Sequence, residues 1–121
     1  MTELIIELPW PPSVNTYWRS IGRGRVIISK KGREYRESAI KNCAHIDTLL
    51  TGRLSVKIEA HPPDARKRDL DNLPKAILDA LTYADVWLDD SQIDDLQIVR
   101  REKVENGGIT VTINNIEEKS C

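Results

Sequence analysis

Two aspartates one residue apart, Asp69 and Asp71, are the residues of this sequence best suited to do chemistry. They stand at the expected start of a helix, so their carboxylates fall close together on one side of the backbone, where a cation relieves their repulsion. Mg²⁺ takes carboxylate oxygens, keeps several waters and lets phosphate oxygens complete its shell. A third carboxylate, from Asp89 or Asp90, would complete a site of the kind used in metal-assisted phosphodiester hydrolysis.

Lys75 follows Asp71 by four residues, so the two side chains are expected on one helical face. There a lysine can neutralise charge that develops on a phosphate. Simpler interpretations are an Asp71 N-cap, a surface ion pair with Lys75, and a solvated turn for the acidic stretch that ends at Asp95. They do not explain why three basic residues directly precede the acidic pair: Arg66, Lys67 and Arg68.

The net charge of -1 conceals a polarised chain. Between Arg19 and Lys41 there are eight Lys or Arg and two Glu, whereas six Asp and no base lie between Asp79 and Asp95. A basic stretch that holds a phosphate backbone beside an acidic stretch that holds metal is one interpretation. Two solvated faces of opposite sign are the other. On the first interpretation the basic residues that contact DNA are Arg19, Arg23, Arg25, Lys30, Lys31 and Arg33, together with Arg66, Lys67 and Arg68.

Other kinds of site find little support in the sequence. His45 and His61 have no partner at zinc spacing, and Cys43 and Cys121 form neither a disulfide framework nor a metal motif. There is no glycine-rich phosphate loop and no nucleophile motif, so we expect no organic cofactor. No apolar run has the roughly 20 residues of a membrane span, and the start lacks the features of a signal peptide. We therefore expect a cytoplasmic protein that does not bind membranes.

The pattern of apolar residues predicts the elements that hold these side chains. Alternation predicts strands, a repeat of three to four residues predicts helices, and Gly and Pro mark the turns. The predicted strands are Glu3–Leu8, Val26–Ile28, Arg53–Ala60, Leu96–Lys103 and Ile109–Ile113, the last two forming an antiparallel hairpin through Asn106-Gly107-Gly108. The predicted helices run from Ser29 to about Leu50, ended by Gly52, and from Asp71, with Pro74 in the first turn, to about Tyr83.

The intervening segments are predicted to be loops: Trp10–Ser20 without a helix, a basic loop at His61–Arg68 and an acidic loop at Val86–Asp95. Residues after Ile116 are expected to be frayed. At 121 residues the chain fits one domain. We expect a single α+β domain over residues 1–121, with a small mixed or antiparallel sheet of about four or five strands and two main helices.

Three blocks of sequence, LPWPPSVNTYWR, RKRDLDNLPKAILDAL and VWLDDSQI, occur in an order and spacing that resemble the RusA family of Holliday junction resolvases. The resemblance implies a small homodimer, bacterial or phage-encoded, that acts at the nucleoid and cuts four-way DNA junctions by paired nicks with Mg²⁺ or Mn²⁺. It implies metal-binding carboxylates at Asp69, Asp71 and Asp90, an essential lysine at Lys75, and Asn72 beside the site. Asp85 stands where the family more often has glycine, so a left-handed turn is expected there.

The expected function is therefore a structure-selective endonuclease that resolves four-way junctions in recombination and repair. One alternative is a branched-DNA-binding protein without cleavage activity, but acid beside phosphate would not help binding alone. Another is a metal-dependent hydrolase of nucleotides or flap ends. The basic helix and Arg-rich loop favour a long polyanion over a small one.

Overall fold

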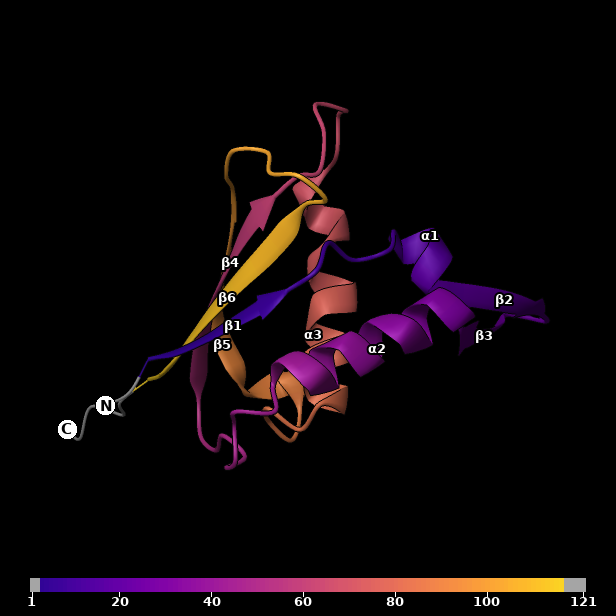
Figure 1. The fold of residues 1–121 in the computed structure, drawn as a ribbon. Coiled ribbons are helices and arrows are strands. Elements are labelled where there is room, and N and C mark those ends of the chain that lie inside the picture. Colours follow the sequence, from indigo (N-terminus) through magenta and orange to yellow (C-terminus); the bar gives the residue numbers. More distant parts are fainter. Residues whose placement is uncertain (1–2, 117–121) are drawn as a thin grey trace.

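A computed structural model describes residues 3–116 and shows one mixed sheet with helices on one face and a separate two-stranded ribbon (Figure 1). The sheet order is β1-β6-β4-β5, and β2 pairs only with β3. The strands are β1 (Leu4–Leu8), β2 (Trp18–Gly22), β3 (Arg25–Ile28), β4 (Leu54–His61), β5 (Ile93–Arg100) and β6 (Gly108–Asn115). The helices are α1 (Val14–Tyr17), α2 (Lys30–Asn42) and α3 (Pro74–Tyr83), with 3₁₀ turns η1 (Leu70–Asn72) and η2 (Asp90–Gln92). The predicted single α+β architecture is confirmed.

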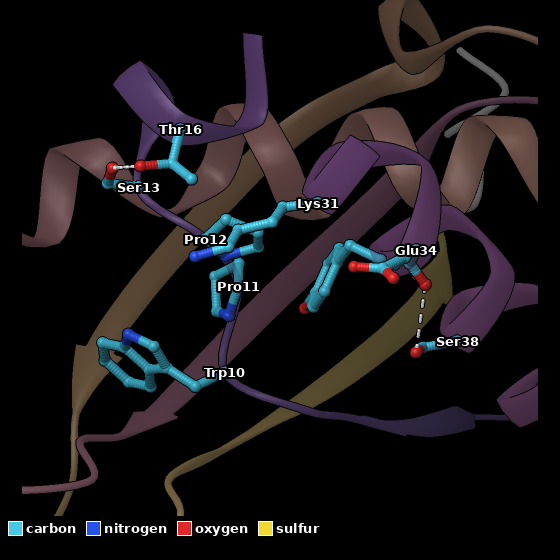
Figure 2. A pocket seen from close by; sticks show the side chains of 9 residues that line it. Trp10, Pro11, Pro12, Ser13, Thr16, Lys31, Glu34 and Ser38 are labelled. Atoms are coloured by element: carbon cyan, nitrogen blue, oxygen red, sulfur yellow. Dashed lines mark hydrogen bonds between the residues drawn. The ribbon is translucent and has the colours of Figure 1, made fainter. Parts of the chain in front are cut away.

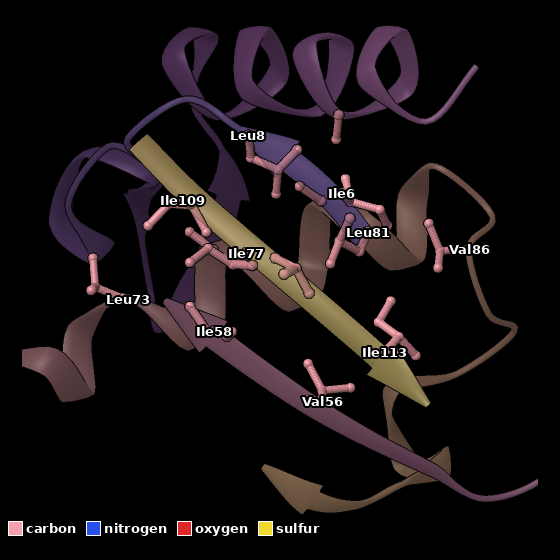
Figure 3. Packing of buried hydrophobic residues seen from close by; sticks show 14 of the residues in the cluster. Ile6, Leu8, Val56, Ile58, Leu73, Ile77, Leu81, Val86, Ile109 and Ile113 are labelled. Atoms are coloured by element: carbon pink, nitrogen blue, oxygen red, sulfur yellow. The ribbon is translucent and has the colours of Figure 1, made fainter. Parts of the chain in front are cut away.

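The core lies between the sheet and the helices (Figure 3). Alternate residues of β4, from Leu54 to Ala60, are buried, while those between them face the wetter side. Helix α3 adds Ile77, Ala80 and Leu81, which are fully buried. No helix within residues 3–116 is long and apolar enough to cross a bilayer.

The predicted hairpin of the last two strands is wrong. β5 begins at Ile93, inside the stretch predicted to be an acidic loop, and it pairs in parallel with β4 instead of with β6. β6 inserts between β1 and β4, antiparallel to both. A parallel neighbour of β4 needs a crossover connection, and α3 supplies it. Long-range pairing of β6 with two strands therefore overrides the local hairpin signal.

Helix α2 begins where predicted but ends early. The Ser29 Oγ atom accepts a hydrogen bond from the Gly32 N–H at 3.0 Å, which caps the first turn. The helix stops at Asn42 instead of about Leu50. The Leu50 N–H donates to the Val86 carbonyl at 2.8 Å, so this segment satisfies its backbone outside the helix. The apolar repeat continues past Asn42 because these side chains still reach the core.

Two local predictions near the termini need correction or lie outside the structure. The Trp10–Ser20 segment contains a helix of four residues, α1, although no helix was predicted. The two prolines precede it, so they leave intact the bonds from the Tyr17 N–H to the Ser13 carbonyl and from the Trp18 N–H to the Val14 carbonyl. The expected fraying after Ile116 and the residue Cys121 fall outside the described residues.

The other cysteine, Cys43, is buried, and burial raises the pKa of its thiol to about 11, as suits an inert core residue.

The turn after α3 is left-handed, as expected. Asp85 has a φ of 62°, a conformation that glycine adopts without strain and most other residues resist. The following residues return to the core, where Trp87 is fully buried and its Nε1–H donates to the Thr82 Oγ1 atom at 2.6 Å. This turn fixes the path from α3 to Asp90.

Candidate active site

Asp69 and Asp71 lie at the entry to α3. Asp69 occupies the N-cap position of η1, but its side chain makes no capping hydrogen bond. Asp69 has extended backbone angles and Asp71 lies inside η1. The N-cap position of α3 is Leu73, with Pro74 as the first helical residue. Both aspartates are exposed. The interpretation of Asp71 as an ordinary helix cap is therefore wrong, and both carboxylates remain free for a ligand.

The three bases before Asp69 differ in their surroundings. Arg68 is 23% exposed, bonds to both carboxylate oxygens of Asp64 at 2.9 Å, and lies over the Trp10 ring at 5.7 Å. Arg66 is 79% exposed and Lys67 is also exposed. Arg68 thus organises the loop, while Arg66 and Lys67 present their charge to solvent. With Asp69 and Asn72, Lys67 and Arg68 line a cavity of about 320 Å³.

Lys75 lies in the first turn of α3 and is exposed. Among residues 3–116 it forms no ion pair with Asp71, contrary to the surface-pair interpretation. Its Nζ atom lies 5.7 Å from the centroid of the Trp18 ring. Lys75 and Trp18 line a groove of about 560 Å³ together with Val14, Asn15, Ser20 and Val26. The ammonium group is thereby held at an open groove.

Asp79 is a site residue that the sequence patterns did not reveal. Its carboxylate accepts two hydrogen bonds from Arg36, from Nε at 2.9 Å and from Nη2 at 3.2 Å, and a short one from the Tyr17 hydroxyl. Burial, followed by the hydrogen bond to Asp79, raises the pKa of Tyr17 above its usual range, so the hydroxyl stays protonated. This network ties α1, α2 and α3 together directly beside Trp18.

The Arg36 guanidinium turns onto Asp79 and is only 20% exposed, so this basic residue of α2 does not project freely into solvent. A signal was available in the sequence. Asp79 follows Lys75 by four residues, so the two share one face of α3. A charged residue four positions after a predicted site residue, on the same helical face, is a candidate for holding that residue in place.

Asp90 opens the turn η2, and its neighbour Asp89 explains why. The Asp89 carboxylate accepts from the Ser91 N–H, and Gln92 completes the capping box from the other side. Asp89 is therefore the structural residue of the pair. Partial burial, a hydrogen bond with Asp89 and the negative charges of Asp89 and Asp79 raise the pKa of Asp90. Unlike Asp89, Asp90 does not cap the turn with its side chain.

Six of the basic residues predicted to contact DNA lie on the projecting β2–β3 ribbon and on the helix that follows it (Figure 1). Arg19, Arg23 and Arg25 lie on the β2–β3 ribbon, whose turn uses positive φ at Arg23. Lys30, Lys31 and Arg33 lie in the first turns of α2, and all six are exposed. We call these six residues the basic arm. Lys31 also lines a separate cavity of about 470 Å³ between α2 and the Pro11-Pro12 segment, without any of the predicted metal ligands (Figure 2).

The described part of the chain does not gather the three predicted carboxylates. Asp69 and Asp71 precede α3, whereas Asp90 follows it in η2. The orange segment after α3 lies at the end of the helix opposite to its start (Figure 1). The ten residues of α3 span about 15 Å. Within residues 3–116, no three acidic, histidine or cysteine side chains are close enough to share a metal ion. The donors have the hard oxygen chemistry that Mg²⁺ prefers, but their placement in one chain does not fit a shared ion.

Comparison with known proteins gives one consistent family. The family described as endodeoxyribonuclease RusA matches residues 9–114. A crossover junction endodeoxyribonuclease RusA from Shigella sonnei (strain Ss046) is 45% identical over 96% of this chain and 98% of its own length. The protein of that name from Escherichia coli (strain K12) is 44% identical over the same shares, and that from Enterobacteria phage 82 is 43% identical over 92% and 93%. The chain belongs to the RusA family of endodeoxyribonucleases.

Proposed function

We propose that the protein is an endodeoxyribonuclease that resolves four-way DNA junctions by paired symmetric nicks, in recombination and repair. Membership of the RusA family and the names of its relatives support this function. The observation that carries it is the exposed pair Asp69 and Asp71 just before α3, with Lys75 in the first turn of that helix, because none of these three charged groups forms an ion pair among residues 3–116. The basic arm supplies the positive surface that a DNA backbone requires.

The proposed ligands of Mg²⁺ are Asp69 and Asp71, with Asp90 as a third carboxylate that the described part of one chain does not bring to the other two. Mn²⁺ is expected to substitute. When bound, the metal would supply Lewis-acid stabilisation of charge on the phosphate and lower the pKa of water. Lys75 is placed to bind a phosphate oxygen and to neutralise charge in the transition state. Packing against Trp18 restricts the lysine, so less conformational freedom is lost when phosphate binds.

A homodimer suits the two-fold symmetry of a four-way junction, because two sites related by a dyad would cut opposite strands. We therefore propose a homodimer that acts on branched DNA in the cytoplasm of a bacterial cell, at the nucleoid. Arg66, Lys67 and Asn72 are proposed to hold the phosphates nearest to the cut, and the basic arm is proposed to hold the flanking duplex.

The test is a gel assay with a synthetic immobile four-way junction and Mg²⁺, with a linear duplex as the substrate control. The native protein should cut only the junction, in paired nicks, and should stop when EDTA is added. Asp71→Asn should abolish cutting while it preserves or tightens junction binding, because it removes a ligand and a negative charge that faces phosphate. Asp47→Asn, the same change at an exposed loop position, should cut normally. Cutting that survives EDTA or Asp71→Asn contradicts the proposal.

A further inference from the structure

A groove lies between α1, the projecting β2–β3 ribbon and the first turn of α3 (Figure 1). It contains none of the predicted metal ligands, and we call it the Trp18 groove. Its volume of about 560 Å³ falls within the usual range for small-molecule pockets, roughly 300–1,000 Å³. The residues that line it are Val14, Asn15, Trp18, Ser20, Val26 and Lys75.

The lining of the Trp18 groove combines a flat aromatic surface with polar groups and one positive charge. Val14, Trp18 and Val26 provide apolar walls, and the exposed Asn15 offers amide donors and an acceptor. Lys75 adds the charge. A matching ligand therefore has a planar body, polar edges and an anionic group. A nucleotide has all three, because its base stacks on aromatic rings, its edges form hydrogen bonds and its phosphate is negative.

The Trp18 ring is held in position by its own subunit before any ligand binds. The Tyr17 ring meets it edge-on, with centroids 5.0 Å apart and an angle of 62° between the planes. The Arg36 guanidinium lies 6.0 Å from the Trp18 centroid. Tyr17 and Arg36 are both fixed by hydrogen bonds to Asp79. A stacking surface that is ordered in advance loses little conformational entropy when a ligand binds.

Trp18 and Lys75 each retain an interaction for a ligand. Within residues 3–116 the buried Trp18 Nε1–H has no hydrogen-bond acceptor. Such a donor is costly to leave unpaired, and a sugar or phosphate oxygen beside the ring would satisfy it. The Lys75 Nζ atom lies 5.7 Å from the ring centroid. A stacked base contributes more than a cation over an exposed ring, so a base is expected to displace this ammonium group onto its own phosphate.

We propose that the Trp18 groove takes one unstacked nucleobase of the DNA strand at the branch point, with the base against the Trp18 ring and the adjoining phosphate on Lys75. The inference rests on the proposed function and deepens it, because it names the part of the junction that this groove recognises. In a linear duplex a base must lose its pair and its stacking before it can enter. Beside a branch point the stack is already interrupted, so entry costs less. The groove thereby favours branched DNA over linear DNA.

The test couples Trp18 to a single base of the DNA. Immobile four-way junctions carry one abasic nucleotide, placed in turn at each position beside the branch point. Affinity is measured by fluorescence anisotropy without a divalent metal, so that no strand is cut. With the native protein, one abasic position should weaken binding about tenfold, as expected for the loss of one stacked base.

Trp18→Leu removes the aromatic surface but keeps an apolar side chain against Tyr17. It should weaken binding to the intact junction by a similar factor, about tenfold, and show no further loss at the abasic position. Trp18→Phe should restore most of the affinity and the abasic effect. Binding of Trp18→Leu to a linear duplex should equal that of the native protein. If the abasic position has the same effect on the native protein and on Trp18→Leu, or no effect on either, the proposal is overturned.

Val26 and Ile27 offer a matched pair of changes that leave Trp18 in place. Both are exposed and adjacent on β3, so their side chains point to opposite faces of the ribbon, and only Val26 lines the groove. Val26→Glu and Ile27→Glu add the same charge to the same strand and should weaken binding to a linear duplex equally. Only Val26→Glu should also lower the ratio of junction affinity to duplex affinity, by about tenfold, and remove the abasic effect. Equal ratios for the two variants overturn the proposal.

The groove and the nuclease function fail in different ways. A native protein that cuts junctions but shows no abasic effect overturns the groove proposal and leaves the nuclease function intact. A native protein that never cuts junctions in Mg²⁺ overturns the proposed function itself.

Discussion

Asp79→Ala is expected to destabilise the protein by about 2–4 kcal/mol. Tyr17 is fully buried, so loss of its acceptor leaves a hydroxyl without a partner at a cost of about 1–3 kcal/mol. The ion pair with Arg36 is mostly shielded, with side chains 20% and 25% exposed, and it contributes up to about 1 kcal/mol. For a domain of this size the melting temperature should fall by roughly 3–5 °C per kcal/mol.

The matched control is Asp79→Asn. It keeps a carbonyl oxygen for the Tyr17 hydroxyl and nearly the same shape, but it removes the charge and replaces the oxygen that accepts from Arg36 Nη2 with an NH2 donor, so a loss of about 1 kcal/mol is expected. Urea unfolding followed by circular dichroism measures both variants, and Tyr17→Phe in each background gives the coupling between the two side chains. The reasoning fails if Asp79→Ala costs less than about 0.5 kcal/mol or if Asn costs as much as Ala.

Three further changes test other local features. Asp85→Gly should raise the free energy of unfolding by about 0.5–1 kcal/mol and leave cutting unchanged, because φ is 62° there; a loss of stability in urea unfolding would contradict this. Gly32→Ala should lower the free energy of unfolding by about 1–3 kcal/mol, because a Cβ atom would lie 2.5 Å from the Tyr17 carbonyl oxygen. An unchanged melting curve would show that the backbone shifts to accommodate the methyl group without cost. The Arg66 N–H and the Arg68 guanidinium lower the pKa of Asp64, so this group stabilises the fold above its unfolded pKa and loses that contribution as pH falls through its folded pKa. The free energy of unfolding of Asp64→Asn should therefore fall less steeply than that of the native protein as pH decreases below about pH 4. An unchanged slope would count against the ion pair.

Elements whose signal is local were determined by the sequence alone. The alternation in β4 predicted both the strand and its buried face, and it is confirmed from Leu54 onward. Ser29 as a helix cap and Pro74 in the first turn of α3 were also predicted correctly. The left-handed turn at Asp85 followed from a departure from the family pattern. Each of these features depends on residues within a few positions of one another.

The motif blocks determined the family for a different reason. Their residues are unusual in combination, so order and spacing identified the RusA family before any geometry was known. The candidate residues Asp69, Asp71 and Lys75 came with them, and their free, exposed placement is consistent with that assignment. Asp79 was missed because its importance depends on Arg36 and Tyr17, which are distant in sequence.

Only the tertiary structure decided which strands are neighbours and which acids can meet. The parallel pairing of β5 with β4, the place of β6 between two strands and the early end of α2 all depend on backbone partners far along the chain. The separation of Asp90 from Asp69 and Asp71 by the length of α3 is of the same kind. A local pattern records which side of an element is apolar, but partners are chosen by packing and hydrogen bonding across the whole fold.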